Sequence, residues 1–523
     1  MHKHLFSLLA VLLLFQGCNA GESTGDKTDQ NVRLPAVAGK FYPGEADQLR
    51  AAIAGFLEDA ITPASLKDAQ PVALIAPHAG YIYSGQIAAD AYAAVSGNKY
   101  DLVVILGTNH TTPGFDDFSI YPRGAYRTPL GDAAIDAEFA DRLMKEADKC
   151  SFNPAVHRQE HSVEVQVPFV QYILPGVKIL PVVVGTNSVE RCTAFGKSIA
   201  AVAGNRKILI VTSSDLSHYP DYDDAVDVDN KLLTAVGTLD PANIKSAIEK
   251  NIRRRLPNLS TCACGEGAIM VAMSAAKALG AKQATIVSYA NSGDALVGDR
   301  SRVVGYGAVV FTRDVQTGLP PLNPPLQSRG GGALSNEVNS GSLTGADKTA
   351  LLRLARKTMQ RYLTSQTVPL PRGFSSAANN KQGAFVTLNK HGELRGCIGH
   401  MAEDTPLYQV VGEMALAAAF NDRRFSPVEV EELDDIEIEI SVLTPYEKIN
   451  KPDDFIVGRD GIVIRKSGRS AVYLPQVAPE QGWNREETLD HLCLKAGLPR
   501  GSWREGAELF TFQADVFHEG GKE

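Results

Sequence analysis

VALIAPHAGYIYSG, residues 72–85, places an apolar run directly before a titratable imidazole. The run stops at Pro77, His78 follows it, and Gly80 and Gly85 come soon after. A short, continuous apolar run bounded by turn residues is typical of a strand that is buried on both faces. We therefore expect a buried strand whose end carries His78 to the rim of a sheet.

Apolar runs of the same kind recur along the first part of the chain. Alanine-rich stretches with helical character, such as QIAADAYAAV and EGAIMVAMSAAKALG, lie between them. The further runs are DLVVILG (101–107), VKILPVVVG (177–185), KILIVTSS (207–214) and ATIVSYA (284–290). This alternation predicts an α/β domain in which helices flank a buried and largely parallel sheet.

A segment rich in proline, glycine and serine, residues 317–344, has no periodic apolar pattern and is typical of a linker. Beyond it, DKTALLRLARKTMQRYL (347–363) has apolar residues at helical spacing behind a cap at Ser342 or Thr344. IEIEISVL (436–443) alternates with period two, as a half-exposed strand does. The patterns predict an α/β domain over 32–314, a linker over 315–343 and a smaller α+β domain over 344–523.

Composition and charge agree with this division. A chain of 523 residues, 44% hydrophobic and 21% charged, is globular and long enough for more than one domain. Its net charge of -8 and the lack of a long basic cluster disfavour nucleic acid as a partner.

The N-terminal stretch MHKHLFSLLAVLLLFQGCNA (1–20) is predicted to be a targeting signal, because its apolar segment is too short to span a membrane. It resembles a bacterial lipoprotein signal. The resemblance implies a signal over 1–18, lipidation of Cys18, a flexible tether over 19–31 and an extracytoplasmic protein anchored in the outer membrane. Simple secretion with cleavage after Ala20 is the alternative. Disulfide pairing among the remaining cysteines stays open.

Polar residues follow several of the apolar runs, at the point where each strand is expected to end. They are His78 after VALIAP, His110 after VVILGTN, Asp215 and His218 after ILIVTSS, and Cys264 within STCACGEGA. Ligands bind beyond the carboxyl ends of the strands in open α/β sheets. A single histidine there is usually structural, but imidazole, thiolate and carboxylate together form the ligand set of a catalytic transition-metal site. The sequence therefore predicts a metal centre.

The segments PHAGYIYSG, LGTNHT, EHSVEVQVPF, SSDLSHY and CGEGAI, in this order, resemble the Memo family, also named AmmeMemoRadiSam system protein B. The resemblance runs from about Pro35 to Thr312 and implies a fold similar to the class III extradiol dioxygenases, which hold non-haem iron(II). It implies His78 and His110 as metal ligands, with Cys264 in place of the dioxygenase carboxylate. The resemblance favours iron(II), but copper or zinc are alternatives because thiolate is a softer ligand than carboxylate.

The same resemblance implies roles for residues around the metal. His218 would act as the acid or base, and Asp215 would orient the site. Glu160, His161 and Glu164 of EHSVE would lie beside the pocket and bind substrate or transfer protons.

HRQEH (157–161) offers a competing motif. It fits H-x-x-E-H, in which two histidines one helical turn apart bind zinc and the glutamate acts as base. This alternative predicts a zinc hydrolase and requires Arg158 and Gln159 to lie on a helix that starts near Asn153, with a third ligand downstream. Chance is a serious explanation for so short a match, and the histidines at the strand ends would remain unexplained.

Four segments of the second part resemble the AMMECR family, AmmeMemoRadiSam system protein A, over roughly residues 347–517. They are LRGCIGH (394–400), AFNDRRFSPV (419–428), LDDIEIEISVLTP (433–445) and GRDGIVIRKSGRSAVYLPQV (458–477). The resemblance implies little about chemistry. From the residues alone, Cys397 could be a nucleophile, with Arg395 lowering its pKa and His400 as a base. Alternatively, Cys397 packs as a small hydrophobic residue beside a tight turn.

Two classes of function remain open. One is a non-haem metalloenzyme, similar to the iron dioxygenases, that acts on an unidentified small molecule. The other is a non-enzymatic metal-binding or adaptor protein with the same ligands. The name of the system implies a radical S-adenosylmethionine enzyme as a functional companion. Because such enzymes normally stay in the cytoplasm, we expect the link to run through a shared metabolite. We expect the lipid anchor to be the only membrane contact.

Overall fold

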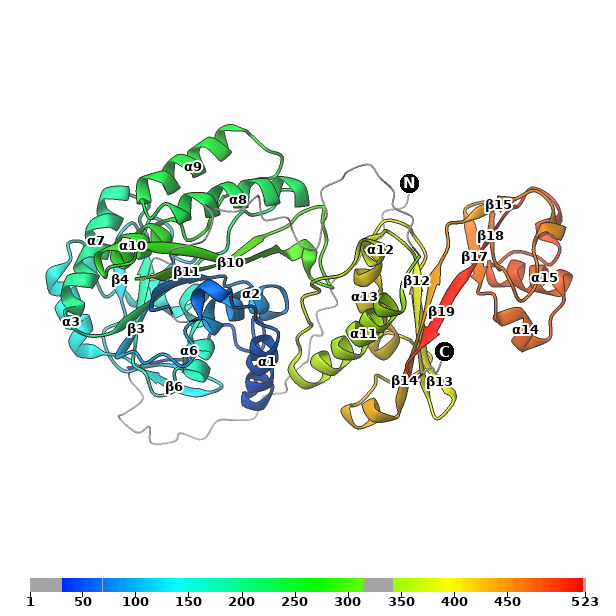
Figure 1. The fold of residues 1–523 in the computed structure, drawn as a ribbon, viewed down its shortest axis with the longest axis horizontal. Coiled ribbons are helices and arrows are strands. Elements are labelled where there is room, and N and C mark those ends of the chain that lie inside the picture. The colour runs from blue at the N-terminus through cyan, green and yellow to red at the C-terminus, as the bar shows by residue number, and fades with distance from the viewer. Residues whose placement is uncertain (1–30, 68, 314–341, 521–523) are drawn as a thin grey trace, which may run out of the picture.

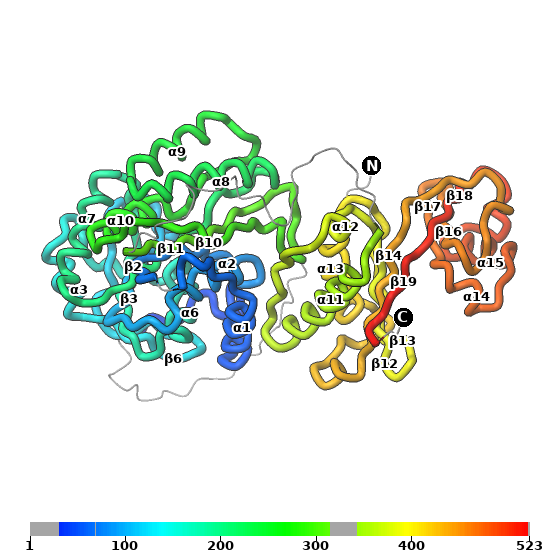
Figure 2. The backbone as a smooth tube through the Cα atoms, viewed as in Figure 1, coloured from blue at the N-terminus to red at the C-terminus, as the bar shows by residue number. Residues whose placement is uncertain are grey.

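The computed structural model forms three bodies in a row (Figures 1 and 2). The largest body is the first domain, and the other two are the halves of the second domain. The structure describes residues 31–67, 69–313 and 342–520.

Several predicted features lie outside the described residues. These are Cys18, the signal over 1–18, the tether over 19–31 apart from Asn31, and nearly all of the linker over 315–343. Within the described part of the chain, no helix combines the length and apolar character needed to cross a membrane.

Among the described residues, the first domain is built on a mixed sheet of eight strands. In sheet order these are β10 (Gln283–Asn291), β11 (Gly305–Thr312), β2 (Pro71–Ala76), β9 (Ile208–Ser213), β3 (Leu102–Thr108), β8 (Ile179–Val184), β4 (Phe118–Ile120) and β7 (Cys150–Ser151). The strands β2, β9, β3 and β8 are parallel neighbours, whereas β11, β10 and β4 pair antiparallel. The predicted parallel sheet is confirmed at its centre, but β10, which contains ATIVSYA, is an antiparallel edge strand.

Helices cover both faces of this sheet (Figure 1). One face carries α1 (Ala46–Glu58), α2 (Tyr81–Ala93), α4 (Pro154–Arg158), α5 (His161–Glu164) and α6 (Val167–Ile173). The other face carries α3 (Ala137–Glu146), α7 (Val189–Ala203), α8 (Tyr222–Gly237), α9 (Pro241–Arg253) and α10 (Glu266–Ala278). Successive residues of β3 alternate between the two cores, with Val104 in one and Val103 and Ile105 in the other. Burial on both faces explains why the strands are continuous apolar runs.

Short elements complete the first domain. A small sheet contains β1 (Val32–Arg33), β5 (Ala125–Thr128) and β6 (Gly131–Ala134), and single turns of 3-10 helix occur at η2 (Ala64–Leu66) and η3 (Ser292–Asp294).

The half of the second domain next to the first is an antiparallel sheet packed against helices. Its strands, in sheet order, are β13 (Glu393–His400), β12 (Ala384–Lys390), β14 (Ile436–Leu443) and β19 (Ala514–His518). Its helical elements are α11 (Gly345–Ser365), α12 (Ser376–Asn379), α13 (Leu407–Phe420) and η4 (Val430–Asp435). Thr344 caps α11 in a reciprocal pair with Asp347, as the sequence predicted.

The last body is inserted between β14 and β19 and has its own small core. Its strands, in sheet order, are β15 (Glu447–Ile449), β18 (Glu508–Phe512), β16 (Gly461–Lys466) and β17 (Arg469–Tyr473). Its helical elements are η5 (Pro452–Asp454), α14 (Val477–Gln481), α15 (Arg485–Lys495) and η6 (Ser502–Arg504). The predicted order, an α/β domain followed by a smaller α+β domain, is confirmed.

Candidate metal centre

Three histidine side chains converge beyond the carboxyl ends of the central strands. His78 lies in the loop after β2, His110 in the loop after β3, and His161 begins α5. Each offers one ring nitrogen, and these nitrogens lie within 4.8 Å of one another. The ring centroids of His110 and His161 are 4.5 Å apart, and each is 5.3 Å from that of His78. The rim of the sheet therefore carries a group of donors that fits a transition metal.

Hydrogen bonding sets the tautomer of His78. Its Nδ1 lies 3.0 Å from the hydroxyl oxygen of Ser213. That hydroxyl donates its own hydrogen to the carbonyl of Ser162, at 2.5 Å, so Nδ1–H of His78 must donate to Ser213. The lone pair of Nε2 then faces the centre, which is the state a metal-binding imidazole needs.

Glu160 plays the same part for His110. The Nδ1–H of His110 donates to the Glu160 carboxylate at 2.9 Å, and the backbone N–H of His110 donates to its other oxygen at 2.7 Å. The backbone N–H of Ser162 also donates to this carboxylate, and Nδ1 of His161 lies 3.5 Å away. Burial alone would raise the pKa of Glu160, but the hydrogen bonds from His110 and Ser162 lower it to about 2. The residue is therefore an ionised support for His110 beside His161.

The buried histidines are neutral in the absence of metal. Burial and the neighbouring His110 lower the pKa of His78 to about 3, and burial and His78 lower the pKa of His161 to about 4. Neutral imidazole is the form that binds metals. The side chain of His78 is 2% exposed, whereas those of His110 and His161 are 30% and 21% exposed. A small molecule can therefore reach the centre on the His110 and His161 side.

Asp215 and His218 lie beside the three histidines. The Asp215 carboxylate accepts the backbone N–H of His78 at 2.7 Å, and its second oxygen lies 4.0 Å from Nε2 of His78. Its complete burial raises its pKa. The Nδ1–H of His218 donates to the carbonyl of Leu216 at 3.0 Å, which leaves Nε2 as a proton acceptor.

Cys264 lies next to His78, in the loop before α10. Its sulfur is 3.2 Å from Nε2 of His78 and 3.7 Å from the carbonyl oxygen of Asp215. Burial raises the pKa of the Cys264 thiol. The mutually close group contains His161 rather than Cys264, so the ligand role of Cys264 stays a prediction.

Glu164 differs from the neighbours with which it was predicted to bind substrate. Its fully buried carboxylate accepts from the hydroxyl of Tyr42 at 2.6 Å and from the backbone of Ala36 and Val37 at 2.8 and 3.0 Å, and it pairs with Arg33. Because both oxygens are occupied by these donors, the carboxylate holds the N-terminal segment in place, and the substrate-binding prediction for Glu164 is wrong.

The zinc-hydrolase alternative from HRQEH is also wrong, because α4 ends at Arg158 and α5 begins at His161. The His157 side chain is buried away from the centre. Its Nε2 lies 3.0 Å from the Ser119 hydroxyl and its Nδ1 lies 2.8 Å from the Tyr126 hydroxyl, so neither nitrogen is available to a metal.

Arg395, Cys397 and His400, the candidate residues of the second domain, all lie on β13, but Arg395 and His400 are paired with carboxylates and not with Cys397. Arg395 pairs with Glu432, and Nε2 of His400 pairs with Asp404 at 2.7 Å. The sulfur of Cys397 accepts from the Thr387 hydroxyl at 3.3 Å, and burial raises the pKa of its thiol. The arrangement predicted to activate Cys397 is therefore not formed, because Arg395 and His400 are engaged elsewhere.

Two functional neighbours were missed by the sequence analysis. Ser213 and Gln166 are buried polar residues, and Nε2 of Gln166 donates to the Ser213 hydroxyl at 2.9 Å. Buried polar side chains of this kind orient metal ligands. Gln166 falls within EVQVPF and Ser213 within IVTSSD, so the only signal was a polar residue inside an apolar run.

Comparison with known proteins gives two family matches. Residues 33–310 match the family model described as Memo-like protein, and residues 352–517 match the model described as AMMECR1. A MEMO1 family protein of Desulfurococcus amylolyticus is 37% identical over 289 residues, which cover 53% of this chain and 98% of that protein. One of Methanopyrus kandleri is 37% identical over 291 residues, covering 54% and 99%. A solved structure of an uncharacterized protein from Pyrococcus horikoshii covers 34% of this chain and 94% of its own, at 37% identity and a TM-score of 0.33.

Proposed function

This chain belongs to the Memo family and continues into an AMMECR1 domain, and on that premise we propose that its first domain is a non-haem metal-dependent oxidoreductase. The observation that carries the proposal is the group of three imidazoles, His78, His110 and His161, two of which already have their Nδ1 atoms held by Ser213 and Glu160. Such outer partners are typical of metal ligands. Iron(II) is the favoured ion, with copper or zinc as alternatives.

The surrounding residues have distinct tasks in this proposal. A bound metal would supply a site where oxygen or water and the substrate come together. Asp215 keeps the His78 loop in position through two backbone N–H groups, at 2.7 and 3.3 Å. Nε2 of His218 accepts the substrate proton or returns it. Cys264 is either a further metal ligand or an uncoordinated thiol beside His78.

Oxygen uptake tests the proposal. The full chain, loaded with iron(II) under nitrogen, is mixed with oxygen and a panel of hydroxylated aromatic compounds. We expect substrate-dependent oxygen uptake that is lost in His110→Ala and retained in Cys397→Ala. Tight iron binding without uptake for any compound would instead support the alternative, a non-enzymatic metal-binding or adaptor protein.

We also propose that the protein is an exported lipoprotein anchored through Cys18, with a radical S-adenosylmethionine enzyme linked only through a shared metabolite. The N-terminal sequence supports this proposal. Labelled palmitate should enter the full-length protein in cells and not Cys18→Ala. Equal labelling of the two would contradict it.

A further inference from the structure

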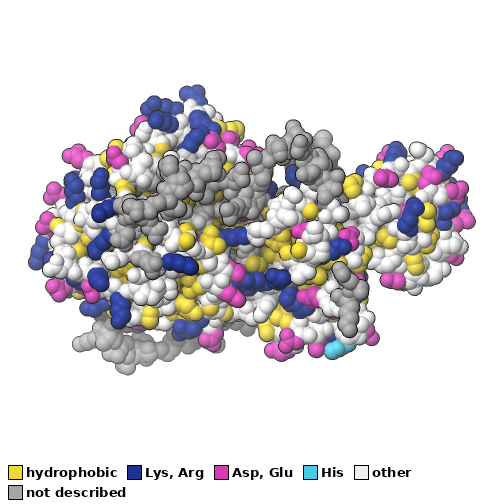
Figure 3. Space-filling model, viewed as in Figure 1, with side chains coloured by type: hydrophobic (Ala, Val, Ile, Leu, Met, Phe, Trp, Pro, Cys, Tyr) yellow, Lys and Arg dark blue, Asp and Glu magenta, His cyan; other side chains and the backbone are white. Residues whose placement is uncertain are grey.

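A groove of about 530 Å³ lies between the two domains. One wall is formed by Phe41, Tyr42 and Ile82 of the first domain, and the other by Tyr362 and Phe420 of the second. In Figure 3, hydrophobic side chains gather along the boundary between the first domain and the region of α11. The volume falls within the range that binds small metabolites.

Contacts between the two domains outside the groove hold its two walls together. Arg361 of α11 pairs with Asp59 at the end of α1, at 2.8 Å, and Arg372 pairs with the buried Asp90 of α2. Leu296 of the first domain belongs to the hydrophobic core of the second. In each ion pair one side chain is buried, Arg361 in the first and Asp90 in the second, while its partner is partly exposed. The groove is therefore a built feature of the folded chain.

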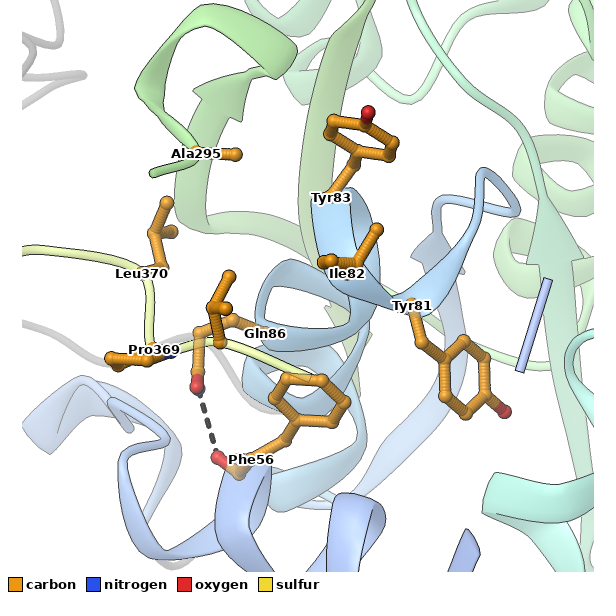
Figure 4. Close-up of a pocket in the computed structure, with 9 residues that line it drawn as sticks. Phe56, Tyr81, Ile82, Tyr83, Gln86, Ala295, Pro369 and Leu370 are labelled. Carbon is orange, nitrogen blue, oxygen red and sulfur yellow. Dashed lines mark hydrogen bonds between the residues drawn. The ribbon is translucent and has the colours of Figure 1, made fainter. Parts of the chain in front are cut away.

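A neighbouring part of the same boundary is closed. There, Pro369 and Leu370 of the second domain face Phe56 and Ile82 of the first (Figure 4). The space between them has no volume for a water molecule. The boundary thus packs tightly at this seam and opens next to it into the groove.

Phe41 connects the groove to the metal centre. Its ring lines the groove and lies 4.9 Å, centroid to centroid, from the ring of His161. Its carbonyl accepts the backbone N–H of Tyr81 at 2.6 Å, just beyond the His78 loop. A molecule in the groove would therefore touch the residue that packs on a histidine of the centre.

The lining indicates the chemistry of the occupant. Tyr362 is 39% exposed, and its ring packs on that of Phe420 at 4.9 Å with a tilt of 43°, so the exposed part of the Tyr362 ring can contact a planar molecule while Phe420 supports it. Lys40 lies at the groove, is exposed, and pairs with no carboxylate among the described residues. An unpaired ammonium beside aromatic walls favours a planar, apolar molecule with one anionic group.

We propose that this groove binds the substrate of the metal centre, that the substrate is a planar aromatic anion, and that the second domain supplies half of its binding site. The step from binding to reaction rests on the proposed function, whereas the binding itself does not. Fusion of the two domains then has a direct reason, because neither domain forms the groove alone.

The test uses metal-free full-length protein and 2-naphthoate as the probe, with binding measured by calorimetry. We expect Tyr362→Ala and Lys40→Ala each to weaken binding about tenfold, which corresponds to about 1.4 kcal/mol. Tyr172→Ala and Lys197→Ala are matched controls, because both side chains are exposed and do not line the groove. Neutral 2-naphthamide should bind more weakly and should not respond to Lys40→Ala. Equal binding of 2-naphthoate to all variants would overturn the proposal.

Two further measurements test the link to the metal centre and the identity of the occupant. With manganese(II) at the centre, the proton signals of bound 2-naphthoate should broaden relative to the zinc(II) protein, and no broadening would overturn the link between groove and centre. A dimer of the full chain that dissociates in Tyr362→Ala would overturn the proposal in favour of a second copy in the groove. Because calorimetry uses metal-free protein, failure there leaves the proposed metal chemistry untouched.

Discussion

The two domains place their candidate residues in opposite ways. In the first domain, His78, His110 and His161 come from separate loops and meet with their ring nitrogens within 4.8 Å. In the second, Arg395 and His400 lie on the same strand as Cys397, yet each pairs with a different carboxylate. Adjacency along a strand spreads side chains over two faces, whereas neighbouring strand ends bring distant residues together.

The partners of the two sets differ as well. Ser213 and Glu160 hold the Nδ1 atoms of His78 and His110, which leaves each Nε2 unprotonated, although in His78 this nitrogen also faces the Cys264 sulfur at 3.2 Å. Burial keeps His78 neutral. In the second domain burial raises the pKa of Cys397 instead, so its thiol stays protonated at neutral pH. A functional site is thus recognised by the donor or acceptor atoms that remain available once the hydrogen bonds and ion pairs of its side chains are known.

The largest effect should come from Glu164, the neighbour of the centre that is not part of it. Glu164→Gln leaves Arg33 without its buried partner, so we expect a loss of about 3–5 kcal/mol in the free energy of unfolding. Urea denaturation measures this loss. Asp132→Asn, which breaks an ion pair whose side chains are 39% and 42% exposed, should cost less than about 1 kcal/mol. A Glu164→Gln protein that is stable but unable to bind metal would restore Glu164 to the site.

Glu160 should behave differently. In Glu160→Gln the ionised acceptor of the His110 Nδ1–H is lost, so metal affinity should fall about 10–100-fold with the fold retained. Competition with a chromophoric chelator measures the affinity. Glu432→Gln is the matched control, because hydrogen bonds from Arg395 also lower the pKa of Glu432 to about 2, far from the centre. Equal affinity of wild type and Glu160→Gln would contradict its supporting role.

Glu432 also tests whether Arg395 has a structural task. Since its folded pKa is lowered, this carboxylate contributes stability above its unfolded pKa of 4.5, and the contribution is lost as the pH falls toward 2. We expect Glu432→Gln to cost about 1 kcal/mol at pH 7, because the side chains of Arg395 and Glu432 keep 13% and 17% of their surface exposed, and nothing near pH 2. Stability measured across this pH range gives the difference. A pH-independent difference would mean that the pair with Arg395 is not formed.

The smallest effect should come from Cys397. Cys397→Ala should leave metal affinity within about twofold of wild type, since the thiol touches Thr387 rather than the centre. The Cys397 thiol should react with iodoacetamide only slowly at pH 7, because its pKa is raised. Mass spectrometry of the labelled peptide measures the rate, and rapid labelling at pH 6 would restore Cys397 as a candidate nucleophile.

The sequence predicts the centre of the fold better than its edges. Continuous apolar runs identified β2, β3, β8 and β9, and the strand-end rule correctly placed His78 and His110 at one rim. The antiparallel direction of β10 was hidden, because an apolar edge strand has the same pattern as a central one. The position of His161 was not predictable in this way. It depends on the break between α4 and α5 at Gln159 and Glu160, and no periodic pattern in the sequence indicates that break.

Prediction from the sequence was also limited by polar side chains whose hydrogen-bond partners lie far away along the chain. Glu164 lies one helical turn from Glu160, yet its carboxylate accepts hydrogen bonds from Ala36 and Tyr42, more than a hundred residues earlier in the chain. No local pattern reveals such a partner. Arg395 also lies at a β-bulge in β13, where Leu388 pairs with Gly396 and Asn389 with Leu394, so a simple period of two does not give its direction relative to His400.

The most direct test of the account is the metal content of the full chain purified without chelators, measured by elemental analysis. We predict one transition-metal ion per chain in wild type and in Cys397→Ala, and less than a tenth of that, as an order of magnitude, in His78→Ala and His110→Ala. Folding of each variant is checked by circular dichroism. If folded His78→Ala and His110→Ala both keep the wild-type content, the metal centre does not lie at these histidines and the central claim is wrong.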